Sequence, residues 1–358
     1  MNYDLLTLSG RFQVTGSVKA AFPYGSGHIN DTFRVVADGR SYLLQRINHL
    51  VFKDIYGLTS NLVSICRFLS QKAGSGEAPG LQVLNPVLTK NGDYMLPDES
   101  GNYWRMFDFV EGSRSYDRAD NKEIAREGGR TFGLFVKLLD EFPAQTLTVT
   151  IPGFHDVNFR ISQFKEAIKA NVAGRVQDIQ KEIAFIESRS GAMKQIDNLG
   201  KSGKIPLRVT HNDTKISNIL FDQNNRGICV IDLDTVMPGY IHFDFGDAIR
   251  TFANTANEDE RDLSKVSMSI EIFEAYTEGF LSQTSEILSM DEIRTLALSA
   301  RYITWEQTLR FLTDYINGDT YYKTAYPGHN LFRAQAQARL LENMEEQSNL
   351  MDKIVTGI

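Results

Sequence analysis

The residues best suited to chemistry lie in one polar stretch between 208 and 247, RVTHNDTKISNILFDQNNRGICVIDLDTVMPGYIHFDFGD. Asp213 is followed after five residues by Asn218, and Asp232 comes fourteen residues after that. Carboxylate and amide oxygens are ligands that Mg²⁺ prefers, often together with waters and phosphates. A further carboxylate beside such a metal can hold a substrate hydroxyl and take its proton. The stretch therefore predicts metal-assisted chemistry on a hydroxyl group.

The backbone pattern explains how these side chains would meet. Residues 218–222 (NILFD) and 228–233 (ICVIDL) are β-rich runs, and the QNNRG segment between them is typical of a turn. Antiparallel pairing places the start of one strand beside the end of the next. We therefore expect Asn218 and Asp232 to be neighbours at the open end of a hairpin, with Asp213 close by on the preceding loop.

The order of these residues matches a kinase catalytic loop, in which His-x-Asp precedes an Asn and then a metal-binding Asp. In this pattern Asp213 is the predicted base, and Asn218 and Asp232 hold Mg²⁺. Lys215 is predicted to offset charge near the γ-phosphate, and Asp234 is a possible helper that also contacts substrate. A buried hairpin with a polar turn is the simpler alternative. It does not explain two acids after an apolar strand, where unpaired charge is costly.

A second acidic motif, Asp244-Phe245-Gly246, has the letters of the kinase metal motif. It lies beyond Pro238 and opens a helical run, so it does not fall at a strand end. We expect Asp244 to be the N-cap of a helix starting at residue 246. Asp247 is expected to be structural, bonded to the backbone of the catalytic loop.

Together these motifs resemble the aminoglycoside phosphotransferase and choline kinase superfamily, over nearly the whole chain. The segments GSGHINDTF, HNDTKISN and VIDLDTVMPG further resemble bacterial N-acetylhexosamine 1-kinases. The resemblance implies an α+β, two-lobed protein-kinase-like fold. Residues 1–110 would form a nucleotide-binding lobe with a small antiparallel sheet, and residues 111–358 a mostly helical lobe with the catalytic loop and the acceptor site. ATP and Mg²⁺ are the implied cofactors.

Three features of residues 1–110 are candidates for binding ATP. Gly25, Ser26 and Gly27 lie between two predicted strands, where a kinase covers the phosphates with a glycine turn. The third strand lacks the usual lysine, so Arg46 is the predicted phosphate ligand, with Gln45 as the alternative. The next helix, roughly 54–72, contains no Glu to pair with that cation. The hinge that would meet adenine is expected at residues 107–111, which include Phe107 and Phe109.

The acceptor site is expected in the helical lobe, whose predicted helices are 121–142, one or two within 158–188, 246–256, 262–283, 291–316 and 329–350. Arg301, Trp305 and Arg310 lie near one helix face, before a loop rich in Tyr. Arg160, Lys165 and Lys169 are expected to form a solvated face. Arginines and aromatic rings suit a neutral polyhydroxyl ligand better than a cation, which would want acids or an aromatic cage. Arg310 is the predicted sugar contact, and His28 can also reach the sugar.

The resemblance sharpens the predicted reaction to transfer of the ATP γ-phosphoryl group to the C1 hydroxyl of an N-acetylhexosamine. A kinase for an aminoglycoside, choline or another amino alcohol is one alternative. A nucleotide-binding module without turnover is another, because the usual lysine and Glu are missing.

Composition sets the remaining expectations. The chain has 358 residues, 42% of them hydrophobic, and a net charge of −7, which argues against nucleic-acid binding. Cys66 and Cys229 lie in apolar patterns and are expected to be packed thiols. The first residues do not resemble a signal peptide, and no apolar run reaches the length of a membrane span. We therefore expect a cytoplasmic protein that needs no obligatory protein partner.

Overall fold

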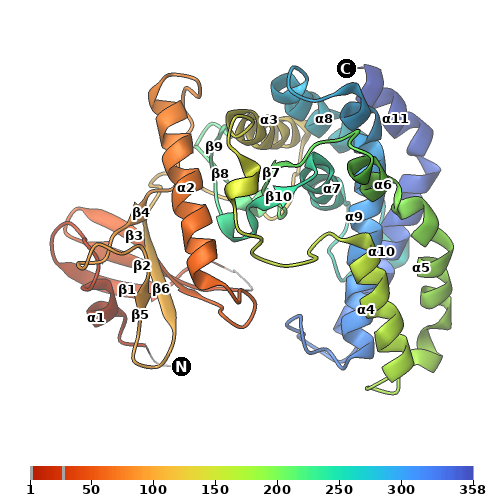
Figure 1. Ribbon diagram of the computed structural model, residues 1–358, viewed down its shortest axis with the longest axis horizontal. Coiled ribbons are helices and arrows are strands. Elements are labelled where there is room, and N and C mark those ends of the chain that lie inside the picture. Colours follow the sequence, from red (N-terminus) through yellow and green to blue (C-terminus); the bar gives the residue numbers. More distant parts are fainter. Residues whose placement is uncertain (1–2, 26–28, 358) are drawn as a thin grey trace. The chain divides into compact units, whose positions relative to one another are not determined.

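The structure is a computed structural model that describes residues 3–25 and 29–357, and it divides into two compact units. Unit 1 comprises Met1–Ser115, Glu141–Pro152 and Leu220–Pro238, and unit 2 comprises Tyr116–Asp140, Gly153–Ile219 and Gly239–Ile358. An antiparallel sheet dominates unit 1 and helices dominate unit 2 (Figure 1). The predicted α+β fold class is therefore confirmed.

The sheet of unit 1 has the strand order β1-β2-β3-β6-β4, and β5 also pairs with β6. Its strands are β1 (Val18–Pro23), β2 (Asp31–Ala37), β3 (Arg40–Ile47), β4 (Pro86–Val87), β5 (Leu96–Pro97) and β6 (Tyr103–Asp108). Alternate side chains of the central strands are buried on one face, in a cluster with Phe12: Val35, Tyr42, Leu44, Trp104 and Met106. This period of two leaves Gln45 and Arg105 on the other face.

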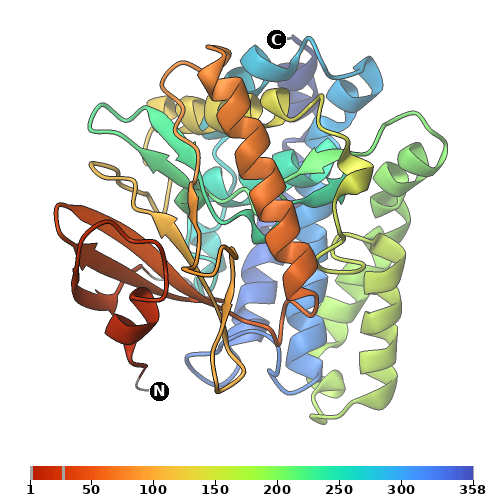
Figure 2. The ribbon, with the colours of Figure 1, turned by 60° about the vertical axis from the view of Figure 1, so that its left-hand side comes forward.

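The described residues of unit 1 include the α-helices α1 (Leu5–Ser9) and α2 (Ile55–Gly74), the latter orange in Figures 1 and 2. Asp54 caps α2 by accepting a hydrogen bond from the Gly57 N–H at 2.8 Å. Asn61 then donates to the carbonyl of Val236 at 3.1 Å, which fixes the helix to the segment after the acidic turn. The helix contains no Glu, as its sequence showed.

Strand β4 occupies only two residues of the β-rich run from Leu81 to Thr89. Only Pro86–Val87 pairs with β6, because Pro86 has no N–H to donate and Gln82 donates instead to Ile228 at 2.6 Å. Cys66 and Cys229 are both buried free thiols, as predicted, and burial raises the pKa of each to about 12.

Unit 2 is mostly helical. Its helices are α3 (Lys122–Leu138), α4 (Val157–Ala170), α5 (Gln180–Met193), α6 (Gln195–Lys201), α7 (Ile241–Phe252), α8 (Ile270–Thr284), α9 (Met290–Ile316), α10 (His329–Glu346) and α11 (Ser348–Gly357). The long helix α9 packs against α4, α7 and α10. Helices α3 and α8 approach so closely that a Cβ on Gly129 would lie 2.1 Å from the Tyr276 carbonyl oxygen. Only glycine fits there.

The range 158–188 contains two helices, one of the two arrangements expected for it, and the predicted helix 329–350 is divided. Residues 158–188 form α4 and α5, because α4 ends at Asn171 in the left-handed conformation with φ 44°. Residues 329–350 fall into α10 and α11, which are separated at Gln347. The remaining short strands are β7 (Arg208–Thr210), β8 (Ile219–Phe221), β9 (Gly227–Val230) and β10 (Met237–Gly239). The predicted hairpin is present, since β8 pairs with β9.

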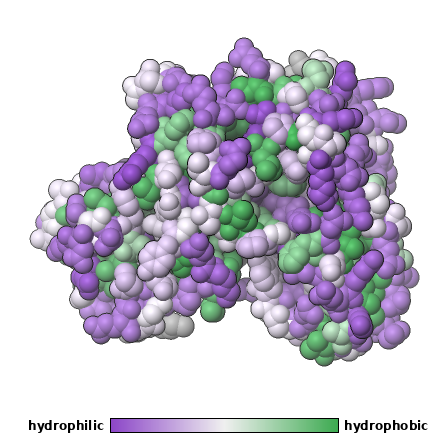
Figure 3. Space-filling view, in the orientation of Figure 1, coloured by the Kyte–Doolittle hydropathy of each residue, from purple (hydrophilic) through white to green (hydrophobic). Residues whose placement is uncertain are grey.

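Hydrophilic side chains cover most of the face seen in Figure 3, with smaller hydrophobic groups among them. Within residues 3–25 and 29–357, no helix combines the length and the apolar composition needed to cross a bilayer.

Candidate active site

The predicted catalytic loop, residues 211–218, lies in unit 2, directly after β7. The side-chain amide of Asn218 donates to the backbone carbonyl of Asp213 at 2.8 Å and to its carboxylate at 3.1 Å. Residues Ile216–Asn218 form a single 3₁₀ turn that brings the amide back over Asp213. Asp213 therefore lies close to Asn218, as expected, and the turn between them is closed by these hydrogen bonds.

Lys215 forms an ion pair with Asp213, with 3.0 Å between Nζ and Oδ1. Burial raises the pKa of the Asp213 carboxyl, but the charges of Lys215 and His211 outweigh it, so the pKa lies below its usual range. Asp213 is therefore ionised at neutral pH. An ionised carboxylate can accept a hydrogen bond from a substrate hydroxyl and align it before proton transfer.

Asp244 holds the backbone of this loop. Its carboxylate accepts hydrogen bonds from the N–H groups of His211 at 2.9 Å and Asn212 at 2.7 Å, and its carbonyl accepts one from the Thr214 hydroxyl at 2.6 Å. Burial raises the pKa of the Asp244 carboxyl to about 6, although these backbone donors lower it. The loop thus keeps its shape through a buried acid on another element.

The prediction that Asp244 is a helix N-cap is wrong. Helix α7 begins at Ile241 with Tyr240 at its N-cap, and Asp244 lies within the first turn. The helix starts earlier because Ile241 and Phe245, four residues apart, are both fully buried on its apolar face. Asp247 does not have the loop-binding role expected of it; one of its oxygens accepts two hydrogen bonds from Arg250, at 2.8 and 3.0 Å.

The second group of predicted site residues follows β9 in unit 1. Asp232 has the left-handed backbone conformation, with φ 60° and ψ 58°, which is costly for a residue other than glycine. Asp234 is buried, with 2% of its side chain exposed, and forms a two-pronged ion pair with Arg105. The Asn30 amide donates to Asp234 at 2.7 Å. Both oxygens of Asp234 are therefore engaged inside unit 1.

The side chains predicted to hold Mg²⁺ are chemically suited to it. Because Asn218 donates both amide hydrogens to Asp213, its amide oxygen is the atom that can bind a cation. Asp232 offers a carboxylate. Among the described residues, no cluster of three or more His, Cys, Asp or Glu side chains forms a complete cage. Each of these two side chains thus offers an oxygen of the kind that Mg²⁺ prefers.

The glycine loop connects β1 and β2. Gly25 has φ +75°, a conformation that favours glycine, while Ser26, Gly27 and His28 lie outside the described residues. In the predicted hinge, Phe107 is buried and pairs with Leu43 of β3. The Phe109 N–H donates to Ser41 at 3.2 Å, so this part of the hinge stretch is still bonded to β3.

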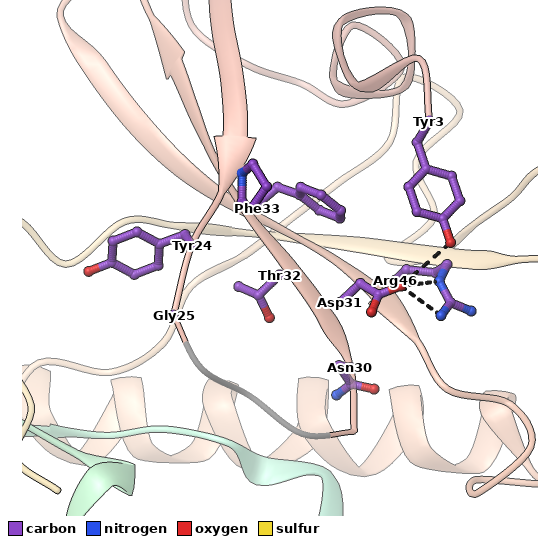
Figure 4. A pocket seen from close by; sticks show the side chains of 9 residues that line it. Tyr3, Tyr24, Gly25, Asn30, Asp31, Thr32, Phe33 and Arg46 are labelled. Carbon is purple, nitrogen blue, oxygen red and sulfur yellow. Dashed lines mark hydrogen bonds and ion pairs between the residues drawn. The ribbon is translucent and has the colours of Figure 1, made fainter. Parts of the chain in front are cut away.

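Arg46 and Gln45 lie on opposite faces of β3. Arg46 forms an ion pair with Asp31 at 2.7 Å, beside the ring of Tyr3. Figure 4 shows Arg46, Asp31 and Tyr3 together at the edge of a pocket of about 460 Å³ that Tyr24 and Gly25 also line. Gln45 instead accepts from Arg105, at 2.8 and 3.0 Å. These partners make Arg46 a poor match to the lysine of a kinase third strand.

The predicted sugar contact, Arg310, lies in a polar cluster of unit 2. Its guanidinium packs over the rings of Phe154 and Tyr322, at 4.9 and 5.8 Å, and donates to Gln307 at 3.2 Å. A second guanidinium, that of Arg160, is near enough for its charge to act on Arg310. Burial and this neighbouring charge lower the pKa of Arg160. The cluster therefore contains two arginines and an aromatic wall.

An acid and a histidine connect this cluster to the catalytic loop. His155 Nδ1 lies 2.6 Å from Glu306, and its Nε2 lies 3.5 Å from the Asn212 carbonyl. Arg160 Nε lies 3.7 Å from Glu306. Burial raises the pKa of Glu306, but His155, Arg310 and Arg160 outweigh it, and the pKa lies below its usual range. The charges of the cluster around Arg310 are therefore coupled, and His155 brings the cluster next to Asn212, the residue before Asp213.

The Tyr-rich loop after α9 is held by one carboxylate. Asp314 accepts hydrogen bonds from the backbone N–H groups of Thr320, Tyr321 and Tyr322 at 2.8 to 3.0 Å. The Asn330 amide donates to the same carboxylate at 2.8 Å. Asp314 therefore fixes the position of Tyr322 beside Arg310.

Several expectations for this region need correction. Arg160 does not belong to a solvated face: its side chain is 13% exposed and donates to the Phe154 carbonyl at 2.8 Å. Trp305 is fully buried, and its indole donates to the Ile186 carbonyl, so it packs in the core. His155, Glu306 and Asp314 were missed. Glu306 and Asp314 could have been found from the sequence, because each is an acid at a position that the helical pattern predicts to be buried.

Solved structures with the same fold include several phosphotransferases. A microcompartment-associated aminopropanol kinase has a TM-score of 0.66 at 15% identity, covering 97% of this chain and 98% of that one. A spectinomycin phosphotransferase with ADP and spectinomycin has a TM-score of 0.56 at 14% identity, covering 98% and 96%. A choline kinase from Cryptosporidium parvum has a TM-score of 0.56 at 13% identity, covering 93% and 90%. At such identities the likeness concerns the fold, which is protein-kinase-like.

The sequence itself carries the family signature. A family model described as the phosphotransferase enzyme family matches residues 22–265, which is more than half of the chain. The matched range includes the glycine loop, the catalytic loop with Asp213, and the acidic turn with Asp232. The chain therefore belongs to the phosphotransferase enzyme family.

Proposed function

We propose that this protein is an ATP- and Mg²⁺-dependent kinase that phosphorylates the C1 hydroxyl of an N-acetylhexosamine, giving a sugar 1-phosphate. Family membership supports phosphoryl transfer, and a neighbour of the same fold was solved with ADP. The choice of acceptor rests on the cluster around Arg310 and Arg160. The choice of the C1 hydroxyl rests on the sequence resemblance of GSGHIN, HNDTKISN and IDLDTVMPG.

In this proposal the catalytic loop prepares the acceptor hydroxyl. Asp213 accepts its hydrogen bond and takes its proton, while Asn218 keeps the carboxylate in place. Lys215 offsets negative charge on the moving phosphoryl group. Asn218 and Asp232 would hold Mg²⁺, which would offset the charge of the phosphate oxygens. Phosphoryl transfer depends mainly on such positioning and electrostatics.

The charged residues around Arg310 are the observation that supports a neutral acceptor. Arg160 and Arg310 contribute two positive charges, and Glu306 one negative charge, within a buried group beside the catalytic loop. A cationic acceptor placed against these two guanidinium groups would be repelled by their charges at low effective dielectric. A neutral sugar with an N-acetyl carbonyl and several hydroxyls offers oxygens that guanidinium groups can bind, and rings such as Tyr322 can pack on its apolar face.

Amino-alcohol or aminoglycoside phosphorylation is the second candidate. It is favoured by neighbours of the same fold, namely the aminopropanol and choline kinases and the spectinomycin phosphotransferase. Among the residues described around Arg310, however, the acids Glu306 and Asp314 are already engaged, by His155 and by backbone N–H groups. The cluster therefore has fewer free acceptor groups for a cation than hydrogen-bond donors for a neutral ligand.

One acceptor panel tests the proposal. ADP release is measured with ATP and Mg²⁺ against N-acetylglucosamine, N-acetylgalactosamine, glucose, choline, ethanolamine and an aminoglycoside. We expect turnover with the N-acetylhexosamines, and phosphorus NMR of the product should show the phosphate on the anomeric carbon. A 6-phosphate, or turnover only with the amines, would refute the substrate. Binding of Mg·ADP without turnover on any acceptor would favour a nucleotide-binding module.

A further inference from the structure

Arg105, on the sheet of unit 1, forms a buried ion pair with Asp234, and none of the predicted site roles involves this arginine. Gln45 of β3 and Arg105 of β6 stand directly opposite each other in the antiparallel register. Both lie on the face opposite the buried cluster of Leu44, Trp104 and Met106. Arg46, the next residue of β3, is directed to the other face, where Asp31 binds it.

Arg105 is held on two sides. Its Nε and Nη2 donate to the Gln45 side-chain oxygen at 3.0 and 2.8 Å. Its Nη1 and Nη2 reach the two oxygens of Asp234, with Nη2 at 2.9 Å. The side chains of Arg105 and Asp234 are only 5% and 2% exposed. This geometry fixes the guanidinium in a single orientation, since a fork bound on both edges cannot rotate.

Asp234, the partner of Arg105, lies close to two segments that are predicted to bind the nucleotide. It is two residues after Asp232, the predicted metal ligand, and it also accepts from Asn30, next to the glycine loop. One carboxylate thus joins the sheet, the acidic turn and the end of the glycine loop, all within unit 1. A cation fixed at this junction is close to the segments predicted to bind nucleotide phosphates.

We propose that Arg105 is the cation that binds the nucleotide phosphates, and that Asp234 is its counter-ion. In protein kinases a lysine on the third strand binds the phosphates and is paired by a Glu on the following helix. Here the third strand has Gln45, and α2 has no acid. The positive charge has moved to the facing residue of β6, and its partner acid has moved to the turn after Asp232. Arg105 keeps one Nη1 hydrogen beyond these contacts to meet a phosphate oxygen.

The Arg105–Asp234 pair differs from the Lys–Glu pair of protein kinases in where its acid lies. Neither member of the pair lies on α2, so the cation is positioned without any movement of that helix. Helix α2 is instead fixed by Asn61, whose amide donates to Thr148 at 2.7 Å and to Val236 at 3.1 Å. The position of this cation therefore does not depend on a partner acid from α2.

The inference rests on the proposed nucleotide-dependent function, but its test needs no acceptor. The dissociation constant of Mg·ADP is measured by calorimetry for the wild type and for Arg105→Gln. We expect the substitution to weaken binding about tenfold or more, as loss of a charged hydrogen bond does. Arg40→Gln is the matched control, because Arg40 is an exposed arginine of the same sheet, paired with Asp108. It should stay within about twofold of the wild type.

Two double variants separate binding from folding. Arg105→Gln with Asp234→Asn removes the buried unpaired acid, so it should recover thermal stability but not Mg·ADP affinity. Arg105→Gln with Gln45→Arg returns the guanidinium from the facing position and should recover affinity to within about threefold. A purely structural Arg105 would show the reverse: reduced stability in Arg105→Gln with unchanged affinity.

Two other results would bear on the assignment of Arg105. If Arg46→Gln weakens Mg·ADP binding and Arg105→Gln does not, the phosphate cation is on the other face of β3 and the proposal is overturned. If the wild type does not bind Mg·ADP at all, the proposed function fails rather than the assignment of Arg105. Sugar specificity does not enter this measurement, so an error in the acceptor leaves it unaffected.

Discussion

The side-chain amide of Asn218 donates to both the carbonyl and the carboxylate of Asp213, at 2.8 and 3.1 Å. One side chain therefore sets the orientation of the predicted base and leaves its own oxygen for a metal ion. Activity should depend on both residues, but through different steps.

Asp213→Asn should lower kcat by about 10²–10⁴-fold, because a positioned general base contributes that much. Mg·ADP affinity should stay close to that of the wild type, since Asp213 does not belong to the predicted metal ligands. Steady-state kinetics and calorimetry measure the two effects. Asp120→Asn, an exposed acid of unit 2, is the control. Wild-type kcat in the Asp213 variant would refute its assignment as the base.

Asp232→Asn and Asp244→Asn should separate metal binding from loop support. Asp232→Asn should abolish Mg²⁺-dependent nucleotide binding. Asp244→Asn places an amide donor against one of the two N–H groups that Asp244 now binds, so it should cost about 1–3 kcal/mol of unfolding free energy and lower kcat. Magnesium titrations of ADP binding, with chemical denaturation, distinguish them. Loss of metal dependence in the Asp244 variant alone would contradict this division.

Arg310→Ala should raise KM for the sugar at least tenfold, since a hydrogen bond to a charged group contributes about 1.5–3 kcal/mol. KM for ATP should change little. Arg294→Ala is a matched control on the same helix, because Arg294 lies in α9 and is exposed. Equal effects of the two substitutions on KM would remove Arg310 from the acceptor site.

Asp314→Ala tests the support of the Tyr-rich loop. Three backbone N–H groups lose their acceptor, so Tyr322 should no longer be held beside Arg310. We expect a higher KM for the sugar and a loss of about 1–3 kcal/mol in unfolding free energy, with Mg·ADP affinity kept. An unchanged sugar KM, despite the lower stability, would show that the loop does not contribute to acceptor binding.

The pH dependence of stability should change when His242 is replaced. Burial lowers the pKa of His242 to about 4, so its contribution to stability is present above the unfolded pKa near 6.5 and is lost as pH falls toward 4. Burial raises the pKa of Asp244 to about 6, so the contribution of this acid is lost as pH rises through 6. The two effects oppose each other between pH 4 and 6.

His242→Gln removes the first effect. Relative to the wild type, the variant should lose about 2 kcal/mol less stability between pH 7.5 and pH 5. Denaturation curves at the two pH values measure this difference. A parallel pH dependence in the two proteins would mean that His242 is protonated in the folded state as readily as in the unfolded chain.

The sequence by itself determined the local elements of the site. The spacing of Asp213 and Asn218 predicts their turn, and the β-rich runs on either side of QNNRG predict the hairpin that ends near Asp232. Local patterns succeed here because turn residues and alternating apolar residues act over a few neighbours. The same patterns predicted strands and helices, and the resemblance of the motifs to a known superfamily predicted the two-lobed fold and the family. The role of Arg310 and the choice of sugar stay predictions.

Tertiary structure decided which side chains face each other across long separations. Asp244 binds the backbone of His211, Arg105 binds Asp234, and Glu306 lies between His155 and Arg160. No local pattern distinguishes Arg105 from an arginine in an ordinary core strand, because the register of two strands determines which residue faces Gln45. A buried charge is stable only where packing brings an opposite charge or a donor to it. The identities of the polar residues were therefore visible in the sequence, while their pairing was fixed by how the elements pack.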